Sequence, residues 1–286
     1  MLTRGFESGL KKRDMALPKL EKPRGILNLR ADEPMPGIWR YWPSDDLAPF
    51  VEHYWTIEWD VPEPIVRETL PHPSVHLVLE QGRREELAGV ATSKFTRVIE
   101  GKSRVFSVKF YPGGFRPFID EPVSTLSNRV CDLSDVLGAS ASGLCDRALA
   151  HADHQATIDV IENFLREFHP LADDSLRLVQ RIASRVIDDR TINRVEQIVD
   201  EFGIGKRTLQ RVFDDYVGVS PKWIIQRFRL HEAAERIASS ANVRWSEIAL
   251  ELGYADQAHF IRDFKKLIGK SPADYSRMLY PERSER

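Results

Sequence analysis

The sequence predicts an α+β multidomain chain, with an amino-terminal β-barrel or sandwich plus accessory helices and an all-α carboxy-terminal part. Two observations predict this class. Short runs rich in aromatic and β-branched residues fill positions 38–118 and are typical of strands. Further along, the stretch around Gly203 recurs around Gly253, with apolar residues at helical spacing in both copies. At 286 residues the chain is long enough for two domains.

Residues 1–30 contain many basic residues and prolines but little apolar periodicity. We interpret them as a mobile basic leader, and a basic arm that touches DNA is the alternative. The predicted strands follow at positions 39–42, 54–59, 74–80, 96–99 and 105–110, with turns expected at residues such as Pro62, Pro64 and Gly101. Short strands at this spacing, without long helices between them, favour a barrel or sandwich over a parallel doubly wound sheet.

The chain becomes helical after Pro122. Apolar residues between positions 158 and 168 form an amphipathic pattern that ends at His169-Pro170, and a further helix begins at Ser175. We therefore place a domain boundary between positions 170 and 174. Residues 31–170 form the β-rich domain with its trailing helices, and residues 171–286 form the all-α domain.

Both copies of the repeat predict a helix, a glycine turn and a second helix. Gly203 and Gly253 supply the left-handed conformation that ends a helix in a tight turn. In each second helix the apolar residues form one stripe, while Arg and Gln, which suit base edges in the major groove, face outward. The outward residues are Lys206, Arg207, Gln210 and Arg211 in the first copy, and Gln257, His259 and Arg262 in the second.

Two helix-turn-helix units are therefore predicted, and the alternative is two amphipathic hairpins that merely pack together. A long helix that begins at Pro221 would hold the two units at a fixed offset. Successive major-groove faces lie about 34 Å apart, so this offset decides whether both units reach DNA at once.

The motifs T-L-Q-R-V-F…G-V-S-P and E-L-G-Y-A-D-Q-A-H-F…G-K-S-P are specific. Through them, residues 171–286 resemble the DNA-binding domain of the AraC/XylS family of bacterial transcription regulators. Gly205 stands where that family often has Ser, and Tyr254 where it often has Phe. The resemblance implies a sequence-specific transcription regulator that binds successive major-groove faces of double-stranded DNA. It places the seven outward residues on DNA-facing positions, with Lys206 at a phosphate.

The resemblance also implies partners. Many regulators of this family carry an amino-terminal half that senses a small molecule, and residues 31–170 are similar to it in architecture only. We expect this domain to bind a small-molecule effector or to mediate dimerisation, and we expect a homodimer. A contact with RNA polymerase is left open.

Net charge constrains the DNA hypothesis. The whole chain carries −2, whereas residues from Asp173 onward contain 20 Lys and Arg against 18 Asp and Glu, a net charge of +2. Because phosphate contacts supply most of the affinity for DNA, the positive residues must gather on one face.

The sequence has no apolar run long enough for a membrane span and no secretory pattern, and its two cysteines are too few for a disulfide framework. We expect a cytoplasmic protein without membrane association.

One residue set suggests catalytic chemistry: His72, His76 and Glu80. Residues four apart share a face of a strand, so the three could line a barrel interior as in metal-dependent barrel enzymes. That class usually places two histidines two residues apart, and prolines flank His72, so the strand is expected to begin only near Ser74. We favour no metal, no cofactor and no enzymatic activity. A metal-dependent barrel enzyme fused to a DNA-binding domain is the alternative.

No motif identifies the effector site. Ligand sites are apolar concavities with a few polar groups, so aromatic and polar residues of the strand region are the weak candidates. They are His53, Trp55, His76 and Arg116.

Overall fold

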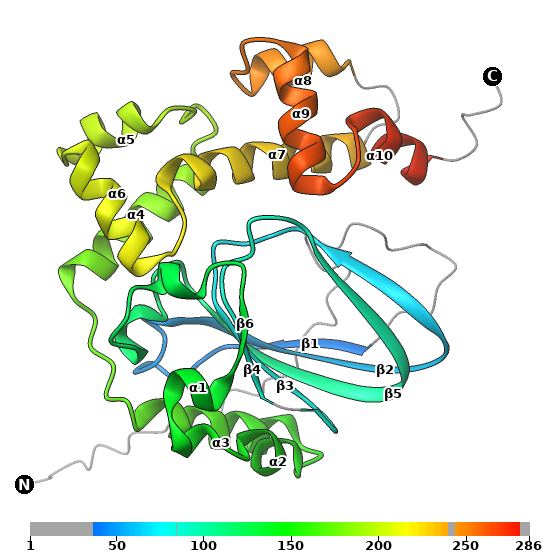
Figure 1. Cartoon of the computed structure of the whole chain (residues 1–286), viewed down its shortest axis with the longest axis vertical. Coiled ribbons are helices and arrows are strands. Elements are labelled where there is room, and N and C mark those ends of the chain that lie inside the picture. Colours follow the sequence, from blue (N-terminus) through cyan, green and yellow to red (C-terminus); the bar gives the residue numbers. More distant parts are fainter. Residues whose placement is uncertain (1–36, 84, 240–243, 281–286) are drawn as a thin grey trace, which may run out of the picture.

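The computed structural model describes residues 37–83, 85–239 and 244–280. Figure 1 shows a sheet with short helices packed against it and a further group of helices formed by the carboxy-terminal part. The predicted leader, residues 1–30, lies outside the described ranges. Within those ranges, every helix is too short or too polar to cross a membrane.

The described strands form one antiparallel sheet of six strands, in the order β1-β2-β5-β3-β4-β6. Their bounds are β1 Gly37–Tyr41, β2 Val51–Thr69, β3 His76–Glu80, β4 Glu86–Ala88, β5 Phe95–Phe110 and β6 Val130–Asp132. Among the described residues, β1 and β6 each pair on one side only, so the sheet is open and not closed into a barrel. The β-rich amino-terminal part is confirmed.

Strands β2 and β5 are longer than the sequence predicts, because Pro62, Pro64 and Gly101 lie inside them and not in turns. The pairing register shifts between Val61 and Ile65, and this irregularity takes both prolines out of the ladder. A proline that has no ladder position loses nothing by lacking an N–H group. Beyond the part that pairs with β1 and β3, the two strands continue as a two-stranded ribbon of residues 61–69 and 95–101.

Short helices follow the sheet and pack against it. Their bounds are η1 Arg116–Phe118, η2 Val123–Leu126, α1 Leu133–Leu137, η3 Ala139–Ala141, α2 Leu144–Leu149 and α3 His154–Arg166. The helix predicted at 158–168 is α3, which begins earlier because the Asp153 carboxylate accepts hydrogen bonds from the first free N–H groups. Its apolar stripe, including Ile161 and Leu165, is buried in the main core.

The carboxy-terminal part is helical, as predicted. Its helices are α4 Asp174–Asp188, α5 Val195–Phe202, α6 Lys206–Tyr216, α7 Pro221–Ser239, α8 Trp245–Glu251, α9 Gln257–Ile268 and α10 Pro272–Leu279. Gly203 ends α5 with a φ of 62°, and Gly253 follows α8 with a φ of 69°. Two helix-turn-helix units result, α5–α6 and α8–α9, and α7 joins them (Figure 1).

The hydrophobic core does not divide at position 170. One cluster contains sheet residues such as Phe110, η1 residues such as Phe118, and Val179 and Phe213 of the helical part. The buried residues of a second cluster lie within the end of α7 and α8 to α10, and the half-buried Leu70, which follows β2, packs against them. The first helix-turn-helix unit therefore shares a core with the sheet, whereas the second unit has a core of its own.

Candidate DNA-binding surface and ligand pocket

The first unit positions α6 with its polar face outward. The Gln197 side chain accepts hydrogen bonds from the N–H groups that precede α5, both at 2.9 Å, and fixes the entry of that helix. Leu209 and Phe213 of α6 are fully buried and anchor the helix on the core. Gly205 lies at the N-cap of α6 without a side-chain hydrogen bond, so burial and not capping holds this helix.

All four outward residues predicted on α6 are exposed. Lys206 donates to Glu196 at 2.7 Å across the surface. Arg207, Gln210 and Arg211 have no side-chain hydrogen bond or ion pair with any described residue. These three side chains are therefore available to a partner outside the chain.

The second unit positions α9 in the same way. The Asp256 carboxylate accepts a hydrogen bond from the N–H group of His259 at 2.7 Å, and this begins the helix. Phe260 and Phe264 are fully buried and anchor it on the second core. Gln257 and Arg262 are exposed, as predicted.

His259 points outward less than predicted. Its side chain is 45% exposed, and its Nε2 atom lies 3.4 Å from an oxygen of Asp263, one turn further along α9. Its ring also meets Tyr254 edge-on, with centroids 5.2 Å apart. Tyr254 therefore contacts one of the predicted DNA-facing residues.

Helix α7 fixes the offset between the two units. It has 19 residues, which corresponds to about 28 Å at the usual helical rise. Gln226 of α7 donates to Asp263 of α9 at 3.1 Å, so the second unit is attached to this helix by a side-chain bond as well as by the core. Figure 1 shows α6 near the start of α7 and α9 further along it.

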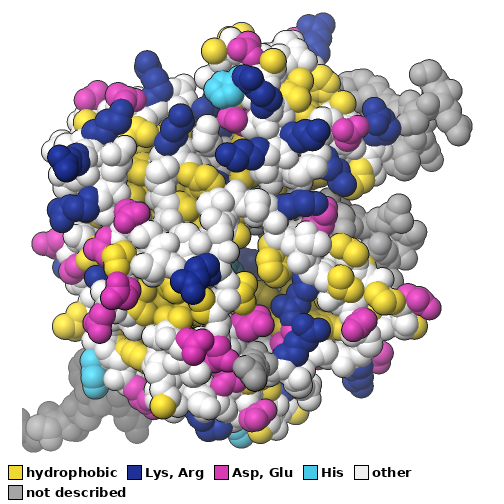
Figure 2. Space-filling view, in the orientation of Figure 1, with side chains coloured by type: hydrophobic (Ala, Val, Ile, Leu, Met, Phe, Trp, Pro, Cys, Tyr) yellow, Lys and Arg dark blue, Asp and Glu magenta, His cyan; other side chains and the backbone are white. Residues whose placement is uncertain are grey.

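The surface charge is uneven. Figure 2 shows Lys and Arg side chains gathered over the carboxy-terminal helices in the upper part of the view. Asp and Glu are more frequent over the amino-terminal domain below them. The small net positive charge of the carboxy-terminal part is thus concentrated, as contact with phosphates requires.

Polar contacts join the first unit to the amino-terminal domain. Arg116 donates to Asp215 of α6 at 2.7 Å, and Ser127 donates to the carbonyl of Gly218 at 2.6 Å. Arg116 also donates to the carbonyl of Ile119 and does not line the ligand pocket described below. Arg116, a weak candidate for effector binding, therefore lies at the interface with α6 and not in the pocket.

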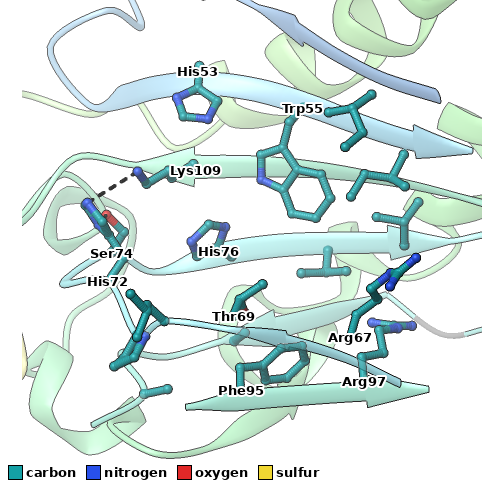
Figure 3. Close-up of a pocket in the computed structure, with 18 of the residues that line it drawn as sticks. His53, Trp55, Arg67, Thr69, His72, Ser74, His76, Phe95, Arg97 and Lys109 are labelled. Atoms are coloured by element: carbon teal, nitrogen blue, oxygen red, sulfur yellow. Dashed lines mark hydrogen bonds between the residues drawn. The ribbon is translucent and has the colours of Figure 1, made fainter. Parts of the chain in front are cut away.

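A cavity of about 360 Å³ lies between the sheet and α7. Figure 3 shows Lys109 beside His72 at one end and Arg67 and Arg97 at the other. The weak candidates His53, Trp55 and His76 all line it. The apolar lining includes Ile38, Trp55, Ile57, Trp59, Val78, Phe95, Ile99 and Val105.

At the Lys109 end, a set of polar side chains is held in place. Lys109 donates to Glu52 at 3.0 Å, and its Nζ atom lies 3.4 Å from Nε2 of His72. The other ring nitrogen of His72 lies 2.9 Å from the Ser74 hydroxyl. Burial and the Lys109 charge lower the pKa of His72, and lower that of His76 to about 3. Both rings are therefore neutral at neutral pH.

The three residues of the metal hypothesis do not come together. His72 lies in the loop before β3, which begins at His76, so the two histidines do not share a strand face. Glu80 forms an ion pair with Arg97 near the other end of the cavity. No group of three His, Cys, Asp or Glu side chains among the described residues could hold a metal ion.

Arg227 of α7 reaches the cavity from the helical part. It is 5% exposed, its Nε donates to the carbonyl of Pro71 at 2.7 Å, and its guanidinium lies 4.5 Å from the Phe228 ring centre. No described carboxylate forms an ion pair with it. Burial lowers its pKa to about 10, so it remains charged at neutral pH. The sequence analysis did not single out Arg227, although a charged residue within the apolar stripe between Ile224 and Phe228 could have indicated a buried functional charge.

Two helix-turn-helix units on one connecting helix define a double helix-turn-helix DNA-binding domain. Residues 198–278 match a family model described as a helix-turn-helix domain, and residues 39–132 match one described as a domain of unknown function, DUF6597. The carboxy-terminal part of the chain is a helix-turn-helix domain of the AraC type.

Several curated proteins are similar to this domain. An uncharacterized HTH-type transcriptional regulator of Haemophilus influenzae is 31% identical over 85 residues, which cover 30% of this chain and 28% of that protein. The probable transcription factor PqrA of Proteus vulgaris is 33% identical over 82 residues, 29% of this chain and 66% of that protein. The chain thus spans less than two thirds of the length of either relative. Among solved structures, ToxT of Vibrio cholerae aligns with a TM-score of 0.39 at 14% identity, over 86% of this chain and 98% of that one.

Proposed function

We propose that the protein is a sequence-specific transcription regulator that binds successive major-groove faces of double-stranded DNA through α6 and α9. One observation carries this proposal: each of these helices presents exposed amide and guanidinium groups that have no side-chain partner among the described residues. They are Arg207, Gln210 and Arg211 on α6, and Gln257 and Arg262 on α9. Arg donates two hydrogen bonds to guanine, and Gln forms a matching pair with adenine.

The attachment of both units to α7 supports simultaneous binding. One continuous helix of about 28 Å holds both recognition helices at a fixed offset, as binding to groove faces about 34 Å apart requires. Lys206 would contact a phosphate. Its present partner Glu196 is exposed, so exchanging that surface ion pair for a phosphate costs little.

The proposal includes partners and location. A net charge of +2 on residues 173–286 is small for DNA binding, and a homodimer would double the number of phosphate contacts. RNA polymerase is a further proposed partner. We place the protein in the cytoplasm with its DNA target, and we assign it no enzymatic activity and no cofactor. Residues 31–170 and 171–286 are its regulatory and DNA-binding parts.

We further propose that the cavity between the sheet and α7 binds a small-molecule effector. It has the expected form of a ligand site, an apolar concavity with a few held polar groups. Its position supports a regulatory role, because α7 carries both helix-turn-helix units. A ligand in this cavity would contact the element that sets their offset.

The test begins with the target sequence. Full-length protein is used to select binding sites from a random DNA library, and each variant is then measured against every single-base change in the selected site. Arg211→Ala and Arg262→Ala should each weaken binding by roughly 5- to 150-fold and relax preference at one position. The two positions should lie about 10 base pairs apart.

Lys206→Ala and a control complete the design. Lys206→Ala should weaken binding to all sequences alike and reduce the salt dependence, because phosphate contacts carry no sequence preference. Lys102→Ala removes an exposed charge from β5, away from both units, and should change nothing. If Arg262→Ala leaves affinity and preference intact, the second unit does not read DNA and the proposal fails for that unit.

A further inference from the structure

The cavity brings one charged side chain of the helical part among residues of the sheet. Arg227 of α7 is the single contributor from residues 171–286 to the described lining. Its bond to the carbonyl of Pro71 joins residues 156 positions apart in the chain. Whatever binds beside Arg227 therefore touches the β-rich domain and the DNA-binding domain at once.

The charges around Arg227 do not balance. Lys109, the other cation at this end of the cavity, already forms an ion pair with Glu52 at 3.0 Å. Arg227 contacts a neutral carbonyl and the face of Phe228, and although the Glu52 and Glu235 charges act on it from a distance, neither forms an ion pair with it. A buried charge without an opposite charge is costly, and proteins normally pair such groups. The described lining thus has two cations at this end, Lys109 and Arg227, and no carboxylate.

We propose that Arg227, with Lys109, binds the anionic group of an organic acid whose apolar body lies against Trp55 and Trp59. The proposal rests on the function proposed above, a regulator controlled by a small molecule, and it names the chemical class of that molecule. The anion supplies the negative charge that the described lining lacks, and its binding joins the sheet to α7.

The rest of the lining favours this class over others. A sugar or another polyol needs many hydrogen-bond partners, whereas tryptophan, isoleucine, valine and phenylalanine side chains dominate the lining between the Lys109 end and the end with Arg67 and Arg97. A cation is disfavoured by the positive charges of Arg227 and Lys109. The Trp55 ring, which meets the His76 ring edge-on, gives the body of the ligand a flat apolar wall.

The experiment uses full-length protein and pairs of compounds that differ in charge alone. Octanoate and indole-3-acetate are compared with octanamide and indole-3-acetamide, and phenyl phosphate tests whether a phosphate replaces the carboxylate. Thermal shift and calorimetry report binding. At least one acid should raise the melting temperature, and its amide should bind at least ten-fold more weakly.

Arg227→Gln removes the charge but keeps a donor for the Pro71 carbonyl. This variant should be as stable as the parent without ligand, and it should bind the acid roughly ten- to hundred-fold more weakly, as expected for losing a bond to a charged group. Lys222→Gln, an exposed position on the same helix, is the matched control and should bind the acid like the parent. If Arg227→Gln folds poorly, Arg227→Lys is the second test. It keeps the positive charge and should therefore retain most of the binding.

The inference is overturned if no acid of the panel binds at millimolar concentration, if acids and amides bind alike, or if Arg227→Gln binds the acid as well as the parent does. Binding of the selected DNA site is measured on the same samples. Intact DNA binding without acid binding would refute this inference alone. Loss of DNA binding in the parent protein would refute the proposed regulator instead, and the acid measurements would still stand.

Discussion

The shared core between the sheet and the first helix-turn-helix unit can be tested at Gly113. This residue has a φ of 82°, and a Cβ atom there would lie 3.1 Å from Val179 and 3.2 Å from Leu176, both on α4. Gly113→Ala therefore imposes two costs. The left-handed backbone costs an L-residue roughly 1–2 kcal/mol, and overpacking against α4 adds about 1–3 kcal/mol. We expect the free energy of unfolding to fall by roughly 2–5 kcal/mol.

Gly82 supplies the matched control. Its φ is 77°, and a Cβ atom there would meet nothing within 4 Å, so Gly82→Ala carries the backbone cost alone. Urea unfolding of both full-length variants, followed by circular dichroism, gives the two free energies. Their difference measures the contact across position 170. Equal losses for the two variants would show that α4 does not pack on this turn and that the two parts have separate cores.

Three further measurements follow from other contacts. Arg116→Ala and Asp215→Ala, in a double-mutant cycle monitored by urea unfolding, should show a coupling of about 0.2–1 kcal/mol, since both side chains are partly exposed; a coupling of zero would mean that this pair does not join the parts. Stability should fall as the pH is lowered from about 6.5 toward 3, because unfolded His76 takes up a proton that the folded form, with its pKa of about 3, does not. His76→Gln should flatten that dependence by up to about 1.4 kcal/mol per pH unit, and an unchanged slope would refute the burial of a neutral ring. Val179→Ala should cost about 1–3 kcal/mol although it lies beyond the predicted boundary, and a cost below 0.5 kcal/mol would contradict its place in the shared core.

Local signals made the helical part predictable. Gly203 and Gly253 end helices through their own backbone conformation, and buried residues such as Phe213 and Phe260 recur at helical spacing. These features depend on interactions within a few residues, so they can be recognised in the sequence without the tertiary structure. The outward positions on α6 and α9 follow from the same periodicity.

The sheet and the cavity depend on contacts between distant residues. The length of β2 and β5 is set by their pairing, in which the register shift near Pro64 lets one strand continue through residues that normally end strands. The prolines around His72 indicate that this residue precedes the strand, as the structure confirms, but they do not show that its ring lies beside Lys109. Arg227 joins the cavity only because α7 packs beside Pro71, a contact that no local pattern encodes.

The two separate cores imply an order of folding during synthesis. The sheet leaves the ribosome before α4 to α6, and amino-terminal parts of a chain generally fold first. Since Val179 and Phe213 belong to the cluster that the sheet begins, the first recognition helix is completed on a surface already in place. The second unit, whose buried cluster lies within α7 to α10 and meets the amino-terminal part through the half-buried Leu70, can assemble afterwards largely from its own residues. A chain that lacked the sheet would thus lose the support of α6 while keeping that of α9, and under the proposed function it would bind one groove face in place of two.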